Sequence, residues 1–302
     1  MELGIFSSLV GTLMTIHALL YNPVFEKFPE KLYEPSQFPP LTLSKKEEDW
    51  QGAPKIFAQA AIVIDQNSAE ILFAQNPDLE LEPASTTKMM TALLVLEKYD
   101  LTKIASVSSG LAQDGSGMGL IVGEQIAIKD LLAGLLVPSA NDAADQLSRL
   151  HPGGTEGFVT AMNVKAKQLH LQHTNYKNPT GYEDPEHVTT VRDLAILARE
   201  AMKNEEFSKL VSLPSLTVFS RDQKIAHQLQ STNELLGNFE GIEGIKTGWT
   251  QVAGECFVAQ ASRGNETYIV VVLNSPDRFR EARTLLEWSF SNYSTESVSV
   301  LN

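Results

Sequence analysis

The sequence predicts an α/β fold in which an antiparallel sheet is flanked by helices and faces a separate helical lobe. Three observations predict it: an early pair of short apolar runs, a long middle stretch with helical periodicity, and several short apolar runs near the C-terminus. Strands that follow one another through short turns pair in antiparallel fashion. Because a cleft between two lobes is the usual location of a functional site, we expect the functional residues where the sheet meets the helical lobe.

The globular part is expected to span residues 56–293. It opens with AQAAIVID and AEILFAQ, two apolar runs joined by three polar residues, a pattern typical of a β-hairpin. A helix follows, and a second helical stretch over 128–150 is broken at Pro138. The remaining expected helices cover 155–170, 190–203 and 280–290, and the late strands cover 215–220, 244–250, 254–263 and 267–275.

Composition excludes several classes of partner. The chain has 302 residues, of which 43% are apolar and 20% charged, as in ordinary globular proteins. It carries 24 Lys and Arg against 37 Asp and Glu, a net charge of -13. No basic stripe is present, which argues against nucleic acid as a partner and against electrostatic adsorption on anionic lipid. Cys256 is the single cysteine, so an intrachain disulfide and a cysteine-based zinc site are excluded.

The first residues indicate a membrane or export segment. From Leu3 to Tyr21 there is no Asp, Glu, Lys or Arg, and this run of 19 residues is just long enough to span a bilayer. No basic residue precedes it and no clear small-residue cleavage site follows, so a cleaved signal peptide fits less well. We expect residues 1–21 to be an N-terminal membrane anchor or signal segment, with an unusual signal peptide and a plain amphipathic helix as alternatives.

The segment after this run is rich in proline. Proline removes a backbone donor and fixes φ, so dense prolines between residues 23 and 40 disfavour helix and central strand. We expect residues 22–55 to be an extended stalk; a strap lying on the domain surface is the alternative. Residues 294–302 are expected to be a polar tail.

Three short motifs carry the candidate chemistry. Ser85 and Lys88 form the only S-x-x-K in the chain, and a spacing of three places both side chains on one face of a helix. Alone, such a serine is usually a helix N-cap. K-T-G occurs once, at Lys246–Gly248 inside an apolar strand. S-x-N occurs at Ser139–Asn141, at the proline-broken helix junction, and at Ser231–Asn233, which we interpret as the approach to the K-T-G strand.

In this order the three motifs resemble the penicillin-binding, serine active-site family, and more narrowly the low-molecular-mass D-alanyl-D-alanine carboxypeptidases of serine peptidase family S11. The resemblance covers roughly residues 56–293 and includes SANDAADQL, NPTGY, STNELLG, GIKTGWT and LLEWSF. It implies a DD-peptidase or β-lactamase-like fold and an extracytoplasmic enzyme; the expected tether through residues 1–21 rests on the uncharged run and not on the resemblance. Such an enzyme trims peptidoglycan stem peptides through an acyl-enzyme on Ser85 and is inhibited covalently by β-lactams.

The residues themselves account for this chemistry. A serine hydroxyl is a poor nucleophile until a base takes its proton, and a free lysine with a pKa of about 10.4 is almost entirely charged at neutral pH. Burial and a neighbouring cation can lower that pKa to about 7–8, and Lys246 is the candidate cation for Lys88. The helix start also places the Ser85 N–H beside the developing oxyanion. Gly248 keeps a side chain out of the cleft, and Thr247 offers a hydroxyl to the substrate carboxylate.

The remaining roles follow from the resemblance alone. It implies that Ser139 relays a proton to the leaving amine and that Asn141 holds the substrate amide and the lysine. It also implies the backbone N–H of Trp249 as the second oxyanion donor. Arg278 stands seven residues before Leu285, where the family carries an arginine that helps to bind the terminal carboxylate, a task that suits a planar, permanently charged fork.

Other activities stay open beside the carboxypeptidase. A DD-endopeptidase, which cuts peptidoglycan cross-links, shares the motifs, and the absence of the C-terminal β-rich domain found in many family members slightly favours it. A class A β-lactamase also needs a glutamate in an E-x-x-x-N context well upstream of K-T-G. Here Glu234–Asn238 lies too close to Lys246, and Ala140 replaces the usual Asp. A binding module without turnover is the third alternative.

No metal or organic cofactor is expected. His170 and His173 lack an apparent third ligand, and the glycine-rich DGSGMG at 114–119 lacks the Lys-Ser/Thr of a phosphate loop. We interpret that stretch as a flexible loop beside the cleft. Cys256 is expected in the core, and Asp142 is expected to cap the helix that follows it.

Overall fold

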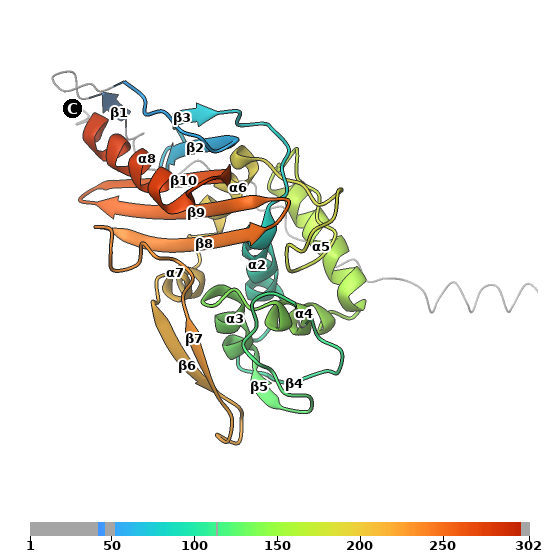
Figure 1. Cartoon of the computed structure of the whole chain (residues 1–302). Coiled ribbons are helices and arrows are strands. Elements are labelled where there is room, and N and C mark those ends of the chain that lie inside the picture. Colours follow the sequence, from blue (N-terminus) through green and yellow to red (C-terminus); the bar gives the residue numbers. More distant parts are fainter. Residues whose placement is uncertain (1–41, 46–51, 113, 297–302) are drawn as a thin grey trace, which may run out of the picture. The chain divides into compact units, whose positions relative to one another are not determined.

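The computed structural model describes residues 42–45, 52–112 and 114–296. Its centre is a five-stranded antiparallel sheet in the order β3-β2-β10-β9-β8 (Figure 1). The strands are β2 (Ala60–Asp65), β3 (Ile71–Gln75), β8 (Ile242–Thr250), β9 (Gly254–Arg263) and β10 (Glu266–Ser275). The first hairpin joins the late strands through the β2–β10 pair, so the expected antiparallel sheet is confirmed.

Successive residues of the central strands enter two different apolar clusters, because side chains alternate between the faces of a sheet. Ile269 and Val271 of β10 belong to the cluster that contains helix α2 (Lys88–Lys98). Val270 and Val272 belong to the cluster that contains helix α8 (Arg278–Asn292), which lies across the other face of the sheet (Figure 1). Burial on both faces explains why these strands read as continuous apolar runs.

Helix α2 connects the sheet to the helical lobe. Its residues from Lys88 to Val95 are all buried, and they share one apolar cluster with the strands and with most of the other helices. These helices are α3 (Ile128–Leu136), α4 (Asn141–Arg149), α5 (Gly154–Gln168), α6 (Val191–Ala201) and α7 (Glu205–Val211). The break expected at Pro138 falls between α3 and α4. A shared core of this kind fixes the start of α2 against both the sheet and the lobe.

Two small pairs of strands lie outside the five-stranded sheet. The expected strand at 215–220 does not join the five-stranded sheet: β6 (Ser215–Phe219) pairs with β7 (Ala226–Gln230), a strand that the sequence analysis missed. Every second residue of β7 is exposed and most of them are polar, so its apolar signal is too weak to recognise. A second pair, β4 (Ile104–Ser106) and β5 (Gln125–Ala127), lies near α3.

Strand pairing also occurs at the two ends of the described chain. β1 (Thr42–Lys45) pairs with β11 (Tyr293–Glu296) in antiparallel register. The sequence analysis placed 42–45 in the stalk and 294–296 in the polar tail, because short polar strands give no periodic signal. The expected anchor at 1–21 lies outside the described residues. Within the described residues, no helix is both long enough and apolar enough to cross a bilayer.

Two buried side chains, Cys256 and Glu281, lie in the interior of the domain. Cys256 is fully buried, as expected, and burial raises the pKa of its thiol to about 12, so the thiol stays protonated.

Glu281 of α8 accepts hydrogen bonds from the backbone N–H groups of Phe57 and Ala58 and, at 2.5 Å, from the hydroxyl of Ser275. This carboxylate joins the entry of the domain to its last helix.

We predict that Glu281→Gln lowers the free energy of unfolding by about 1–3 kcal/mol, because an amide N–H would then face the donors that the carboxylate satisfies. Thermal unfolding should reveal a melting temperature lower by several degrees. Glu156→Gln on the exposed side of α5 is the matched control and should change stability by less than about 0.5 kcal/mol. An unchanged melting temperature for the Glu281 variant would refute this role.

Candidate active site

The S-x-x-K pair lies at the junction of a short 3-10 turn and a helix. Ser85 is the second residue of turn η1 (Ala84–Thr87), and Lys88 is the first residue of α2. Lys88 Nζ lies 2.9 Å from Ser85 Oγ. The Lys88 side chain is fully buried, whereas Ser85 is partly exposed and lines a cleft. A serine hydroxyl open to the cleft is therefore in hydrogen-bond contact with a buried amine.

Two acceptors besides the contact with Ser85 fix the orientation of the Lys88 amine. Lys88 Nζ donates to Asn141 Oδ1 and to the backbone oxygen of Thr180, both at 2.7 Å. Asn141 Nδ2 donates to the backbone oxygen of Asp114 at 2.7 Å, so Oδ1 must be the atom that faces the lysine. Carbonyl and amide oxygens only accept. A neutral amine has two N–H groups and one lone pair, and the lone pair is thus left to accept a proton from the Ser85 hydroxyl.

Burial and a neighbouring cation favour this neutral form. Burial lowers the pKa of Lys88 well below its usual range, the charge of Lys246 lowers it further, and Asp142 opposes the shift. Lys246 is itself 1% exposed, and its Nζ donates to the backbone oxygen of Thr247 at 2.9 Å. Burial, and then the charge of Arg278, lower the pKa of Lys246 to about 7. Both lysines therefore lose a proton more readily than an exposed lysine does.

The S-x-N motif lies where the chain turns into α4. Ser139 has a backbone φ of +64°, a left-handed conformation that is uncommon outside glycine, and its side chain lines the cleft. Asn141 is the first residue of α4. Backbone strain of this kind persists only where the surroundings enforce it, and here it presents both side chains of the motif to the same cleft.

The sequence analysis expected Asp142 to cap α4, and this is borne out only in part: its carboxylate accepts from the backbone N–H of Ala143, in the first turn of the helix, at 2.8 Å. The cap position falls on Ala140, and Asp142 is a residue of the helix itself. Its carboxylate accepts from the backbone N–H groups of Met118, Gly119 and Leu120, at 3.0, 3.0 and 3.1 Å. These three bonds add to the one from Ala143, so the carboxylate joins the start of α4 to the glycine-rich stretch and gives each of these backbone N–H groups a partner.

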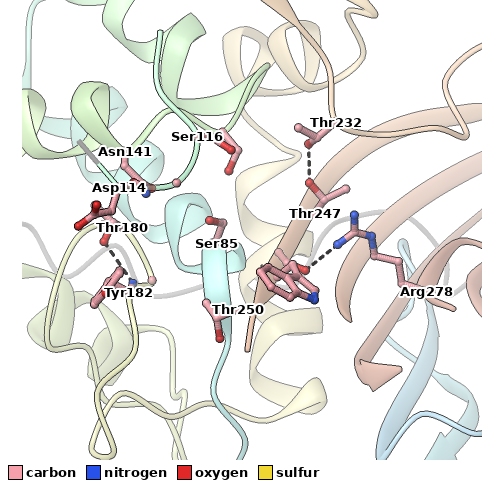
Figure 2. A pocket seen from close by; sticks show the side chains of 15 residues that line it. Ser85, Asp114, Ser116, Asn141, Thr180, Tyr182, Thr232, Thr247, Thr250 and Arg278 are labelled. Atoms are coloured by element: carbon pink, nitrogen blue, oxygen red, sulfur yellow. Dashed lines mark hydrogen bonds between the residues drawn. The ribbon is translucent and has the colours of Figure 1, made fainter. Parts of the chain in front are cut away.

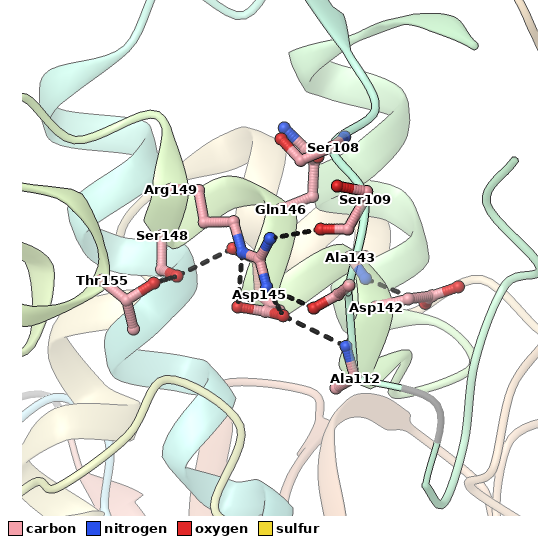
Figure 3. Close-up of polar contacts among 11 residues, drawn as sticks. Ser108, Ser109, Ala112, Asp142, Ala143, Asp145, Gln146, Ser148, Arg149 and Thr155 are labelled. Carbon is pink, nitrogen blue, oxygen red and sulfur yellow. Dashed lines mark hydrogen bonds and ion pairs between the residues drawn. The ribbon is translucent and has the colours of Figure 1, made fainter. Parts of the chain in front are cut away.

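The rest of α4 holds the residues that precede this stretch (Figure 3). Gln146 accepts from the N–H of Ser108 at 2.7 Å, and Asp145 accepts from the N–H of Ala112 at 3.1 Å. Arg149 donates to two backbone oxygens of the same stretch, at 2.8 and 2.5 Å. A single helix thus positions both the S-x-N motif and the loop whose backbone orients it.

The K-T-G strand approaches the Ser85 turn closely. A Cβ atom on Gly248 would lie 3.0 Å from the backbone nitrogen of Ser85 and 3.0 Å from the Cβ of Ala84. Any larger residue at this position would push strand β8 away from the turn. Trp249 follows, with its side chain 64% exposed at the edge of the cleft. The glycine therefore lets the backbone of the strand lie beside the N–H of Ser85.

Thr247 and Arg278 lie on the same wall of the cleft (Figure 2). The hydroxyl oxygen of Thr247 is 2.5 Å from that of Thr232, and Arg278 Nη1 donates to the backbone oxygen of Gly248 at 2.8 Å. Thr232 is the middle residue of the second S-x-N, which the sequence analysis interpreted only as the approach to this strand. Two hydroxyls and one guanidinium thus face the cleft together, an arrangement suited to a carboxylate.

The cleft has a volume of about 400 Å³. It is lined by Ser85, Asp114, Gly115, Ser116, Ser139, Asn141, Thr180, Gly181, Tyr182, Thr232, Thr247, Gly248, Trp249, Thr250 and Arg278. Of the expected site residues, only the two lysines are missing from this lining, because both are buried beneath it. Within the lining, the formal charges are those of Asp114 and Arg278. Sequence reasoning missed Thr180 and Tyr182, although NPTGY was noted as part of the resemblance.

His170 and His173, which follow α5, do not belong to a metal site formed by the described residues. Among these residues, no group of three or more His, Cys, Asp or Glu lies close enough together to hold a metal ion. His173 Nδ1 instead lies 3.2 Å from a carboxylate oxygen of Glu80.

A comparison of the sequence with family profiles decides the classification. Residues 47–277 match the peptidase S11 profile, described as D-alanyl-D-alanine carboxypeptidase. The chain belongs to this family. The expected family is confirmed, and so is the expected fold, because solved DD-peptidases share it.

Two S11 relatives and one solved structure illustrate the similarity. The chain is 34% identical to D-alanyl-D-alanine carboxypeptidase DacF of Bacillus subtilis, over 79% of this chain and 63% of the relative. It is 34% identical to a D-alanyl-D-alanine endopeptidase of Pseudomonas aeruginosa, over 76% of each. The crystal structure of the Streptomyces K15 DD-transpeptidase superposes with a TM-score of 0.76 at 29% identity, covering 80% of this chain and 100% of that one. The chain thus spans about 63% of the length of the Bacillus relative.

For this S11 chain we predict that Lys246→Gln moves the acidic limb of the acylation pH profile to higher pH. The base must be neutral, so the rate rises with pH through the pKa of Lys88, and the Lys246 charge is one cause of the depression of that pKa. Removing the charge should raise the pKa of Lys88. The test is the second-order rate constant for acylation by a fluorescent penicillin between about pH 5 and 9. The exposed Lys209→Gln is the control, and a limb that stays in place or moves to lower pH would contradict the prediction.

Proposed function

We propose that this chain is a serine D-Ala-D-Ala carboxypeptidase that trims peptidoglycan stem peptides through an acyl-enzyme on Ser85. The observation that carries the proposal is the hydrogen-bonding of Lys88. Its amine has two acceptors for its N–H groups, at 2.7 Å each, and the Ser85 hydroxyl at 2.9 Å for its lone pair. Family membership supports the same reaction, since the S11 profile is described as D-alanyl-D-alanine carboxypeptidase.

In the first half-reaction, Ser85 Oγ attacks the carbonyl carbon of the penultimate D-alanine while its proton passes to Lys88 Nζ. The oxyanion forms beside the Ser85 N–H at the helix start, and we assign the second donor to the backbone N–H of Trp249. When the intermediate collapses, the C–N bond breaks and the terminal D-alanine leaves with a proton on its amine. We assign the relay of that proton, from Lys88 to the amine, to Ser139.

In the second half-reaction, water attacks the ester of Ser85 and gives one proton to Lys88 Nζ, which passes it to the serine oxygen as the ester C–O bond breaks. The carboxylic acid formed releases the other proton to solvent. The stem peptide leaves as a free carboxylate, and the amine of Lys88 is again neutral. We assign the hold on the substrate amide to Asn141. The terminal carboxylate of the substrate is bound by the hydroxyl of Thr247 and by the guanidinium of Arg278, the residues that face the cleft from one wall.

A DD-endopeptidase is the second candidate, favoured by the Pseudomonas relative that carries that name at 34% identity. Both activities break a bond next to a D-alanine, and they differ in whether a terminal residue or a cross-link is cut. Diacetyl-Lys-D-Ala-D-Ala, assayed beside a purified cross-linked muropeptide, separates them. Faster hydrolysis of the cross-link than of the tripeptide would replace the carboxypeptidase assignment by the endopeptidase.

Two other readings have less support. Among the described residues that line the cleft there is no glutamate, although a class A β-lactamase needs one for deacylation. A second E-x-x-x-N string, Glu200–Asn204, starts in the last turn of α6 and runs past its end, and Glu200 pairs with Lys203 at 2.6 Å. A binding module without turnover would not require an amine held against the nucleophile.

We also propose that the domain acts outside the cytoplasm, where peptidoglycan lies, and that residues 1–21 tether it through a stalk that begins at residue 22 and ends before the strand at 42–45. The uncharged run from Leu3 to Tyr21 supports the tether. The strand at 42–45 supports a stalk that ends earlier than residue 55. Recovery of a tagged full chain in the alkaline wash of membranes, rather than in the pellet, would overturn the tether.

The proposed function is tested by incubation with a fluorescent penicillin, followed by gel detection and peptide mass mapping. We expect one covalent adduct on Ser85, and its absence would end the proposal. Lys88→Ala should lower the acylation rate by about 10²–10⁴-fold while the domain stays folded, because it removes the general base. Lys129→Ala, on the exposed side of α3, is the control and should be acylated at the wild-type rate. Rapid acylation of the Lys88 variant would show that another group is the base.

A further inference from the structure

A closed loop, residues 175–188, supplies one of the three partners of Lys88. Asn175 and Val188 pair across its base, with N–H to oxygen distances of 2.9 and 3.1 Å. The loop supplies the backbone oxygen of Thr180, which accepts from Lys88 Nζ at 2.7 Å. A backbone oxygen can serve this purpose only if the loop is held in place, so the contacts that hold it matter for the chemistry.

The tip of the 175–188 loop is folded by one side chain. Asn178 Oδ1 accepts from the backbone N–H groups of Thr180, Gly181 and Tyr182, at 3.2, 2.8 and 3.0 Å. Its Nδ2 donates back to the oxygen of Tyr182 at 2.9 Å. With these bonds the tip has a fixed shape, and the direction of the Thr180 carbonyl is fixed with it.

The tip is also packed against the S-x-x-K turn. Gly181 has a φ of +83°, and a Cβ there would fall 1.8 Å from the backbone oxygen of Ala84. The backbone oxygen of Pro179 accepts from the hydroxyl of Thr91, one turn along α2 from the lysine, at 2.7 Å. The loop therefore contacts the turn before the lysine and the helix after it.

At the base of the loop a buried histidine makes the remaining contact with the turn. His187 is 1% exposed, and its Nε2 lies 2.9 Å from the hydroxyl oxygen of Thr87. The backbone N–H of Lys177 donates to Nδ1 at 3.4 Å, so the proton of the neutral ring is on Nε2, which donates to Thr87. Burial lowers the pKa of His187 to about 4, so the ring keeps this neutral form in neutral solution. The ring also packs edge-on against Tyr176.

We infer that His187 is a positioning residue for acylation. Its hydrogen bond to Thr87, the residue just before Lys88, fastens the base of the 175–188 loop to the S-x-x-K turn. The Thr180 carbonyl then meets one N–H of the lysine. The inference rests on the proposed function, because it concerns the same nucleophile and base, but it assigns a task to a residue that touches neither of them.

The physical consequence follows from the geometry of the amine. With both N–H groups engaged, the lone pair of Lys88 has one direction left, toward Ser85. If the loop moves away, the amine can rotate, and the fraction of time in which the lone pair faces the hydroxyl falls. Such a loss of orientation slows the bond-making step and leaves the initial binding of the ligand largely unaffected.

The test separates the two steps of penicillin acylation, the dissociation constant of the initial complex and the rate constant of bond formation. His187→Leu removes the donor at similar volume, His187→Gln keeps an N–H donor, and Thr87→Val removes the acceptor without changing the shape. His187→Leu and Thr87→Val should each lower the rate constant at least about tenfold, with the dissociation constant changed by less than about twofold. His187→Gln should recover most of the rate, and the double variant should be no slower than either single one.

His173→Leu, at a half-exposed histidine on the surface, is the matched control and should be unaffected. All rates are measured well below each variant's melting temperature, and Thr87→Val keeps the test valid if His187→Leu does not fold. Wild-type rate constants in Thr87→Val, additive losses in the double variant, or an effect confined to the dissociation constant would each overturn the inference. If the wild-type chain itself is not acylated, the proposed function is wrong, and the inference about His187 falls with it. If the wild type is acylated and the variants behave like it, only the inference about His187 is wrong.

Discussion

The structure of this site depends on one buried amine. Lys88 is fully buried at the start of α2 and makes three polar contacts, with the η1 turn, the start of α4 and the 175–188 loop. Burial of an uncompensated ammonium is costly, so the surroundings favour the neutral form and leave one lone pair to take up a proton. The lysine stands at the junction of the sheet and the lobe, where the η1 turn just before it meets two segments distant in sequence, the start of α4 and the 175–188 loop.

The neighbouring elements are packed closely around this junction. Gly248 lets the K-T-G strand lie against the Ser85 turn, and Gly181 lets the 175–188 loop lie against the other side of it. Lys246 adds a second buried amine whose charge favours the neutral form of the first. Helix α4 positions Asn141 through the backbone of the 114–120 stretch, which Asp142 in turn holds. Each contact acts on Lys88 through a different element, so the function of the site depends on the assembly of the whole domain.

The sequence was sufficient to predict those elements and site residues whose side chains themselves form the recognisable pattern. The early hairpin, the late strands and the three motifs were recognisable because apolar periodicity and residue identity are properties of the sequence itself. The Thr180 carbonyl could not be recognised in the sequence, because every residue has a backbone oxygen. The position of this oxygen depends on the side chains of Asn178 and His187 more than on that of Thr180. Asp142 was expected only as a helix cap, and the hydrogen bonds that it also accepts from the 118–120 stretch were not foreseen, because they join segments far apart in the sequence. Strand β7 was missed because its exposed polar residues dilute the strand signal.

The central claim is that Lys88 is neutral in the resting enzyme at a pH where a free lysine is charged. It is tested most directly by NMR titration of chain labelled with ¹³C at the lysine Cε atoms, with the Lys88 signal assigned by its loss in Lys88→Arg. We predict that this signal shows the shift of a neutral amine well below the free-lysine pKa of about 10.4. A Lys88 signal that keeps the shift of an ammonium up to about that pKa would contradict the account.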